Sequence, residues 1–381
     1  MENFRIYLSA IAAAMAISCS EIPSEPAPSL AEGDATASRI ELARMLAALP
    51  IGVEQMEEVH DAVSSSSGNG YDEEYTMKDL LTDPGAGVGD TKASGSYGTA
   101  MRDLIARYLS EKASTKASSF SAEKYLEALS ESDMQIYWPY SQDWDGKTYP
   151  IVTFDPGFGA ESNYGYEIRI GADGMRVVDS VYVDETIAAK RPVWVINRND
   201  DSAYTPVEML IKEKSTGTAP SSSVVKRRLQ VKTFTMLRNY DSWFGGASEF
   251  FVKCGSVDGF KATSEAELKN YQAGVTDFMI SVKRGYVGMA VPCETILLSD
   301  FTSQMSKLVF MITEDDGGTR TSWKCAAEVK VKSKTYGFDL EIPYNEKDDI
   351  VWRGQLDAGF FEQEDEVTAR FGDVRITFAL E

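Results

Sequence analysis

Apolar residues recur at two different spacings along the chain, and the change of spacing predicts how the chain is organised. Between residues 38 and 132 they recur at the three-to-four-residue period of an amphipathic helix. The helices predicted in this segment are 38–49, 53–63, 99–112 and 121–129. Ser38 and Ser121 stand where N-caps are expected, residues 50–52 separate the first two helices, and the serine-rich residues 64–69 end the second. We therefore expect a small helical module over residues 38–132.

From residue 133 onward the period changes to that of β-strands. Short runs rich in β-branched and aromatic residues are separated by Gly, Asp and Asn, which is typical of strands joined by turns. In the middle of the chain these runs are 135–140, 150–154, 166–170, 176–178, 180–183 and 192–196. Residues 215–223 have the composition of a linker, so we place a domain boundary near residue 220.

The C-terminal segment, residues 224–381, contains about eight amphipathic strands and no helical period longer than residues 264–271. This count, the alternation and the spacing of the turns predict an antiparallel β-sandwich. The predicted fold class is therefore α+β and multidomain. It comprises the helical module, a β-rich middle domain at residues 133–220 and the C-terminal sandwich.

The first nineteen residues have the pattern of an export segment. Arg5 is followed by an apolar run over residues 6–17, which is shorter than the roughly 20 residues that span a bilayer. Small residues and Cys19 follow directly, as in a lipoprotein signal peptide, so we predict that residues 1–18 are removed and that Cys19 is lipidated. A cleaved secretory signal without lipid is the alternative. Residues 19–37, which are rich in proline and polar residues, are predicted to form an extended tether.

Residues 20–29 resemble the acidic leader that follows the lipidated cysteine in surface lipoproteins of Bacteroidetes-type bacteria. The resemblance implies a protein of the cell envelope that is held to a membrane by its N-terminal lipid. It favours the outer membrane, with the folded part exposed at the cell surface or to the periplasm.

The composition of the chain excludes several classes of function for its folded part. The formal charge of −21 opposes binding to nucleic acid, because phosphate recognition needs clustered lysine and arginine. The single histidine, His60, excludes an HExxH zinc site, and a Ser-His-Asp triad would depend on this residue alone. We expect His60 to be a surface or partly buried helix residue rather than a base paired with Asp61, because the chain has no G-x-S-x-G motif.

Three cysteines remain after Cys19: Cys254, Cys293 and Cys325. An odd number in an oxidising compartment allows one disulfide and one thiol. Each of the three also lies in an apolar strand-like run, where a free cysteine packs as a small hydrophobic residue.

Four aromatic residues gather beside acidic and amide residues at 137–146, and they are candidates for ligand binding: Tyr137, Trp138, Tyr140 and Trp144. Aromatic faces flanked by carboxylates and amides suit sugars, because C–H groups stack on the rings while hydroxyl groups bond to the polar neighbours. Large aromatic residues also fill hydrophobic cores and the seams between domains, and this segment lies at such a seam. Both interpretations stay open.

Two acidic loops of the C-terminal segment resemble those of C2 domains. Residues 229–231 and 239–253 look like that family's opening strand, its acidic glycine loop and the next strand, and residues 308–318 are similar to its strand that ends in a D-x-D loop. The resemblance implies calcium ligands at one end of the sandwich and, in many members, docking on lipid. The candidate calcium ligands carried over are Asp241, Asp315 and Asp316. Glu249 and Phe250 stand where the family has Asp and Pro.

These features favour a non-catalytic cell-envelope lipoprotein with an adhesion or ligand-binding role. Its expected partner is a glycan or a surface protein, with or without Ca²⁺. A hydrolase that uses two carboxylates, such as a glycosidase, is the alternative, since that chemistry needs neither histidine nor metal. A structural component of the envelope is a third interpretation. An acidic pair at the base of a pocket would favour the enzyme, and an aromatic strip on a flat face would favour glycan binding.

Overall fold

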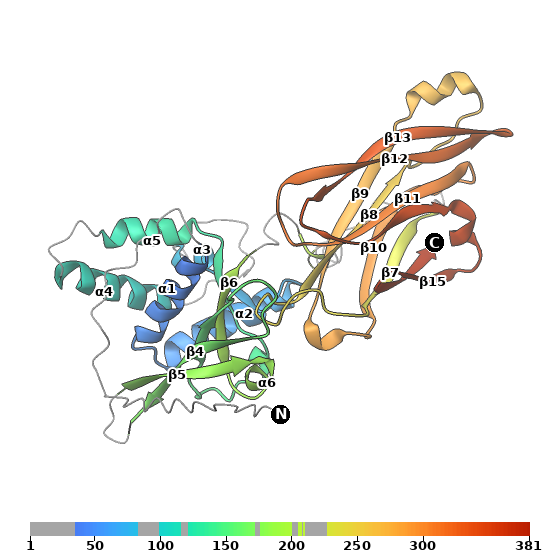
Figure 1. The fold of residues 1–381 in the computed structure, drawn as a ribbon. Helices are drawn as coiled ribbons and strands as arrows, with labels where there is room; N and C mark the ends of the chain where they lie inside the picture. Colours follow the sequence, from blue (N-terminus) through green and yellow to red (C-terminus); the bar gives the residue numbers. More distant parts are fainter. Residues whose placement is uncertain are drawn as a thin grey trace, which may run out of the picture.

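The computed structural model describes residues 35–82, 99–115, 121–171, 176–199, 205–207, 209 and 227–381. The predicted signal peptide, Cys19, nearly all of the tether and the boundary near residue 220 lie outside these residues. Figure 1 shows two lobes: an N-terminal lobe (residues 35–199), drawn in blue and green, and a C-terminal lobe (residues 227–381), drawn in yellow to red. Among the described residues, no helix is both long and apolar enough to cross a bilayer.

The helices of the N-terminal lobe include all four that the sequence predicts. They are α1 (Ala35–Ala48), α2 (Val53–Gly68), α3 (Met77–Leu81), α4 (Ala100–Thr115), α5 (Ala122–Ser130) and the short α6 (Glu185–Ala188). Ser121 caps α5 as expected, because its Oγ accepts a hydrogen bond from the Lys124 amide at 3.3 Å. Helix α2 continues through the serine cluster that was predicted to end it. Ser66 is completely buried there, so tertiary packing outweighs the weak helix propensity of serine.

A six-stranded sheet completes the N-terminal lobe, with the strand order β1-β2-β6-β3-β4-β5. Its strands are β1 (Glu74–Thr76), β2 (Met134–Tyr137), β3 (Ile151–Phe154), β4 (Ser162–Ile170), β5 (Arg176–Asp184) and β6 (Val193–Arg198). All neighbouring strands are antiparallel except β3 and β6, which are joined through the β4–β5 hairpin and α6. The first strand comes from the segment predicted to be purely helical.

The helical segment and the middle β segment share one hydrophobic core, so the two predicted domains form a single α+β unit. Leu46 of α1, Val59 of α2 and Leu104 of α4 belong to the same buried cluster as Ile136 of β2 and Trp194 of β6. An amphipathic helix and a half-buried sheet each leave one apolar face, and burying the two faces together satisfies both elements.

The C-terminal lobe confirms the predicted antiparallel sandwich. One sheet has the order β10-β7-β16-β15, and the other has the order β13-β12-β11-β8-β9 with β14 paired to β11. The strands are β7 (Leu229–Met236), β8 (Ser248–Ser256), β9 (Gly274–Val282), β10 (Val291–Leu298), β11 (Met305–Glu314), β12 (Arg320–Val331), β13 (Lys334–Asn345), β14 (Asp349–Asp357), β15 (Glu366–Phe371) and β16 (Val374–Leu380). Strands β14 and β15 were not predicted, because their exposed charged residues hide the apolar alternation.

The cysteines of this lobe pack as small hydrophobic residues. Cys254 and Cys293 are fully buried and Cys325 is partly buried, and all three are free thiols. Burial raises the pKa of the Cys254 thiol, which keeps it protonated and unreactive.

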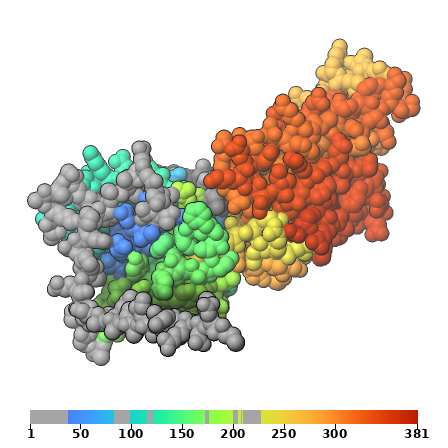
Figure 2. Space-filling model, in the orientation of Figure 1, coloured from blue at the N-terminus to red at the C-terminus, as the bar shows by residue number. Residues whose placement is uncertain are grey.

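The two lobes meet where residues 239–247, which we call the docking loop, lie against the N-terminal lobe. Trp243 and Phe244 of this loop belong to one buried cluster with Tyr137, Val183 and Val193. Because alternate residues of a strand face opposite sides of the sheet, this cluster covers the face opposite to the one that packs against α1, α2 and α4. Figure 2 shows the junction, where yellow residues of the C-terminal lobe touch green residues of the N-terminal lobe.

Candidate functional site

The docking loop is fixed to the N-terminal lobe by hydrogen bonds as well as by packing. Trp243 Nε1 donates to the Glu161 carbonyl at 3.0 Å. Asn197 Nδ2 donates to the carbonyl oxygens of Phe244 and Gly245 at 3.0 and 2.9 Å. The resemblance to a C2 domain predicts that this loop is a calcium loop at an open end of the sandwich. In the structure most of its length serves as the contact between the lobes.

A pocket of about 380 Å³ lies beside the docking loop, between the two lobes. The N-terminal lobe supplies residues from the last turns of α2 and just after it, from the end of β2 and the segment that follows it, and from the start of α6. The C-terminal lobe supplies the docking loop and the 3₁₀ turn Arg284–Tyr286. Lining residues that carry charged or aromatic groups include Asp72, Glu73, Tyr137, Glu185, Arg284 and Tyr286. The pocket therefore combines aromatic surface with charged groups contributed by both lobes.

Both cationic side chains that line the pocket are paired with carboxylates across the junction. Lys283 Nζ lies 3.1 Å from Glu73 Oε1, and Arg284 Nε lies 3.0 Å from Glu185 Oε1. Tyr140 also donates its hydroxyl hydrogen to Glu185 Oε1 at 3.0 Å. These pairs balance the positive charge of the pocket and hold the two lobes in one arrangement.

Two carboxyl groups in the pocket have pKa values displaced in opposite directions. Burial and then the charge of Glu73 raise the pKa of Asp72 to about 7. Its Oδ2 accepts a hydrogen bond from the Ala247 amide of the docking loop at 3.0 Å. Burial acts to raise the pKa of Glu185, but the hydrogen bonds and positive charge of Arg284 outweigh it and lower that pKa. The pocket thus holds Asp72, whose protonated form is favoured by its surroundings, and Glu185, whose ionised form is favoured.

The four aromatic residues predicted as one ligand platform are divided between the core and the pocket. Trp138 is fully buried and packs edge-on against Trp144 and Trp194 at 5.3 and 5.8 Å between ring centroids. Trp144 is half-buried and donates from Nε1 to the Thr148 carbonyl. Tyr137 and Tyr140 line the pocket.

Trp138 and Trp144 therefore follow the packing interpretation, while Tyr137 and Tyr140 remain candidates for ligand binding at the pocket. Tyr137 and Trp138 are neighbours on an extended segment, so their side chains point to opposite faces of the sheet. The aromatic surface of the pocket is completed instead by Trp243 and Tyr286, which the sequence analysis did not select.

His60 is a half-buried residue of α2, as expected. Its ring lies 5.7 Å from Trp138 and 5.3 Å from Trp144, measured between ring centroids. Its Nδ1 is 3.7 Å from Asp61 Oδ1, which is too long for a hydrogen bond that would orient a catalytic base. The contacts of His60 are those of a packing residue.

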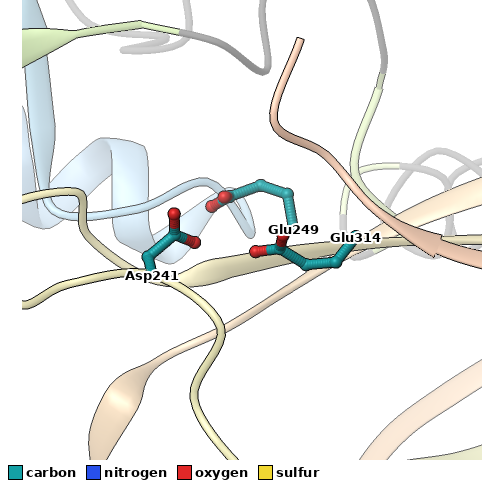
Figure 3. A group of neighbouring side chains, drawn as sticks. All are labelled: Asp241, Glu249 and Glu314. Carbon is teal, nitrogen blue, oxygen red and sulfur yellow. The ribbon is translucent and has the colours of Figure 1, made fainter. Parts of the chain in front are cut away.

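A second acidic group lies in the C-terminal lobe, where the docking loop, the start of β8 and the end of β11 each contribute one carboxylate. Figure 3 shows the carboxyl groups of Asp241, Glu249 and Glu314 converging, and one oxygen of each lies within 4.8 Å of the others. Burial raises the pKa of Asp241, and hydrogen bonding to Glu314 opposes that rise. Of the three predicted calcium ligands, the structure brings only Asp241 into this group.

The other two predicted calcium ligands take different places. Asp315 is buried, and its Oδ1 accepts hydrogen bonds from the Gly317 amide and from Asn345 Nδ2, so it shapes its own loop. Asp316 is exposed, and its partial removal from water by the surrounding loops, followed by the charge of Asp241, raises its pKa to about 6. Glu249, which stands where the family has Asp, and Glu314 complete the group with Asp241.

Asp241→Asn is expected to raise the melting temperature in calcium-free buffer at pH 7, because it removes a negative charge from a crowded, buried group of carboxylates. A gain on the order of 1 kcal/mol corresponds to roughly 2–4 °C. Differential scanning calorimetry checks this, with Asp339→Asn, an exposed residue of β13 that lies across from Ala326, as the control that should change little. Millimolar calcium tests the predicted metal role: a rise in the wild type that Asp241→Asn lacks would support it, and no rise in the wild type would remove it.

The sequence analysis missed the charged residues of the pocket: Asp72, Glu73, Glu185, Lys283 and Arg284. Glu73 and Lys283 are 210 positions apart, and Glu185 and Arg284 are 99 positions apart. No motif or spacing links them, and each sits among many other charged residues of the chain. Only the docking of the two lobes brings them together.

The function of the protein is therefore inferred from the geometry of the pocket and of the acidic group. Comparisons of the chain with protein-family models, with curated proteins and with solved structures find no match.

Proposed function

We propose that this protein is a non-catalytic, lipid-anchored protein of the cell envelope that binds a neutral glycan in the pocket between its lobes. The observation that carries the binding role is the pocket itself, in which tyrosine and tryptophan rings stand beside paired charged groups. Concave sites with aromatic walls and a few convergent polar groups are where proteins bind small polar ligands.

The pairing of charges favours an uncharged ligand. An anionic ligand would compete with Glu73 for Lys283 or with Glu185 for Arg284, and a cationic ligand would compete with the two basic residues. A neutral sugar can accept and donate hydrogen bonds without breaking either pair, and its C–H faces stack on aromatic rings. A short neutral oligosaccharide therefore fits this chemistry better than a charged molecule.

The cell-envelope part of the proposal is supported by the export pattern that ends at Cys19. Acyl chains on that residue would hold the folded lobes at a membrane, since each buried methylene contributes about 0.8 kcal/mol. Mass spectrometry of the membrane-bound protein checks this part: an unprocessed N-terminus in the soluble fraction would contradict it.

Tyr286→Ala is expected to weaken glycan binding about tenfold, because it removes an aromatic wall worth ~1.4 kcal/mol. Tyr286 lines the pocket and is 45% exposed, so the variant should fold normally. An array of neutral, anionic and cationic oligosaccharides measures the binding, and Tyr164→Ala serves as the control because Tyr164 is 65% exposed and lies outside the pocket. If the two variants bind like the wild type, or if only charged sugars bind, the proposed site is wrong.

The opposite pKa displacements in the pocket favour a second candidate, a hydrolase that uses two carboxylates. Asp72, with a pKa of about 7, has the property of a general acid, and the ionised Glu185 has that of a base or nucleophile. The same oligosaccharides distinguish the two functions. Release of new reducing ends by the wild type, but not by Glu185→Gln, would establish the hydrolase and replace the binding role.

A further inference from the structure

Phe158 is the most exposed large apolar residue in the described part of the chain, and its backbone is strained. It is 104% exposed, so its whole ring lies in solvent. Its φ of 58° is in the left-handed region, which is unfavourable for a residue with a bulky side chain. A glycine would adopt this conformation without strain, yet position 158 carries an aromatic ring. Strain of this kind is found where the surrounding structure enforces it, commonly at binding sites.

The loop that carries Phe158 is fixed by polar contacts. Asp155 Oδ1 accepts a hydrogen bond from the Gly157 amide at 2.7 Å, and the Ala160 amide donates to the Gly157 carbonyl at 3.2 Å. The other carboxylate oxygen of Asp155 forms an ion pair with Arg39 of α1, and both of these side chains are mostly buried. Because the loop is already ordered, little conformational entropy is lost when Phe158 is buried against a partner.

Two exposed tyrosines lie at the same end of the sheet as this loop. Tyr164 is near the start of β4, and Tyr182 of β5 pairs directly with it. The two residues are 65% and 53% exposed, and their rings meet edge-on at 6.2 Å between centroids. We call Phe158, Tyr164 and Tyr182 the aromatic corner. Phenylalanine and tyrosine side chains are favourable at the boundary between lipid headgroups and acyl chains.

Helix α1 begins beside the aromatic corner. Arg39, in its second turn, pairs with Asp155 of the loop. The carbonyl of Ala47, near the other end of the helix, accepts a hydrogen bond from Arg176 Nη2 at 2.6 Å. Arg176 starts β5, at the opposite end of the β4–β5 hairpin from Tyr182. These two contacts fix the direction of α1 along the sheet, so the chain enters the lobe next to the aromatic corner.

We infer that the aromatic corner contacts the bilayer to which the chain is anchored, with the ring of Phe158 among the lipid headgroups. The inference rests on the proposed anchoring at Cys19 and adds a second, non-covalent contact to it. Ala35, the first residue of α1, follows Cys19 by 16 residues, which span at most about 55 Å. The tether therefore keeps the end of the lobe where α1 begins near the membrane, at a high effective concentration of lipid.

Acidic residues beside the aromatic corner favour lipids without net charge. Glu161 is exposed and directly precedes β4, and Asp184 pairs with Ser162 at the same end of the hairpin. An anionic leaflet would repel these carboxylates. The expected partner is therefore a zwitterionic surface, such as one of phosphatidylethanolamine and phosphatidylcholine.

Fluorescence quenching tests this contact with the full lipidated chain in vesicles of those two lipids. A thiol-reactive dye is placed at Ser162→Cys, beside the aromatic corner, and a quencher is carried on the lipid headgroups. Ile170→Cys is the matched control, because Ile170 is an exposed residue at the other end of β4. We expect strong quenching of the dye at position 162 and little at position 170.

Phe158→Asn tests the role of the ring. Asparagine tolerates the left-handed conformation, so the melting temperature should stay at the wild-type value. With the dye at position 162, the ratio of quenched to unquenched dye should fall at least about tenfold, because the main apolar contact is lost. Ile170→Asn removes an exposed apolar side chain at the other end of the strand and should leave this ratio unaltered.

Flotation of the same vesicles separates this inference from the anchoring. A chain that floats with the vesicles but is quenched equally at positions 162 and 170 would refute the membrane contact and leave the anchor in place. A chain that does not float would overturn the anchoring and this inference with it. Quenching that requires anionic lipid, or that Phe158→Asn does not reduce, would also contradict the inference.

Discussion

Trp243→Ala is expected to separate the two lobes into independently melting units. Trp243 is 1% exposed, stacks on Phe244 at 4.0 Å between ring centroids and bonds to the Glu161 carbonyl. Replacing a buried aromatic residue by alanine costs about 3–5 kcal/mol, and here the loss falls on the contact between lobes. Calorimetry should show two transitions in place of one, and small-angle X-ray scattering should show a larger radius of gyration.

Two further variants test whether the effect of Trp243→Ala is specific to the contact between the lobes. Trp323→Ala removes a half-buried tryptophan that packs against a cluster made only of C-terminal-lobe residues, so it should lower stability without changing the spacing of the lobes. Gly246→Ala acts on the junction by another route. Gly246 has a φ of 122°, and a Cβ at this position would overlap Asp72 Oδ2, so this variant should also loosen the lobes. A native scattering profile for both junction variants would show that the docking loop does not hold the lobes together.

Raising the pH from 5 to 8.5 is expected to weaken the junction of the lobes, and Asp72→Asn is expected to remove much of this dependence. The folded protein raises the pKa of Asp72 from 3.8 to about 7. The resulting stability is fully present below pH 3.8 and is lost as the pH rises through about 7, because the folded state must then hold an unfavourable buried charge. The difference in pKa corresponds to roughly 4 kcal/mol as an upper value.

The groups around Asp72 set the size of this effect. The charge of Glu73 raises the pKa of Asp72, and the charge of Lys283 and the Ala247 amide lower it. Asp316 and Asp348, in acidic loops of the C-terminal lobe, also have pKa values raised to about 6. Their ionisation should therefore also lower the free energy of unfolding as the pH rises. Asparagine keeps an oxygen acceptor for the Ala247 amide but cannot ionise, so it isolates the contribution of Asp72.

Denaturant unfolding of the wild type and of Asp72→Asn at several pH values measures this dependence. Between the ordinary pKa of 3.8 and the raised pKa of about 7, the free energy of unfolding should fall more steeply in the wild type than in the variant. Above the raised pKa the variant should be the more stable of the two. Parallel slopes for the two proteins across that range would show that Asp72 is already ionised at low pH or lies in contact with water.

Much of the local structure was predictable because local spacing encodes it. The four helices over residues 38–132 follow from the helical period, and the Ser121 cap follows from a hydroxyl placed just before an apolar run. The C-terminal sandwich follows from the alternation of apolar and polar residues and from the spacing of the turns, although β14 and β15 were not predicted. These patterns show which side of an element is apolar, since that depends only on neighbours in the chain.

The sequence by itself therefore determined most of the longer elements, the α+β class and the sandwich, and it supplies the export pattern on which the proposed anchoring rests. Only the tertiary structure decided what covers each apolar face. It buried Trp138 in a core while Tyr137 reached the pocket, and it turned an expected calcium loop into the contact between lobes. It also joined Glu73 to Lys283 across 210 positions. Such pairs depend on how whole elements dock, and docking leaves no short-range signal in the order of residues.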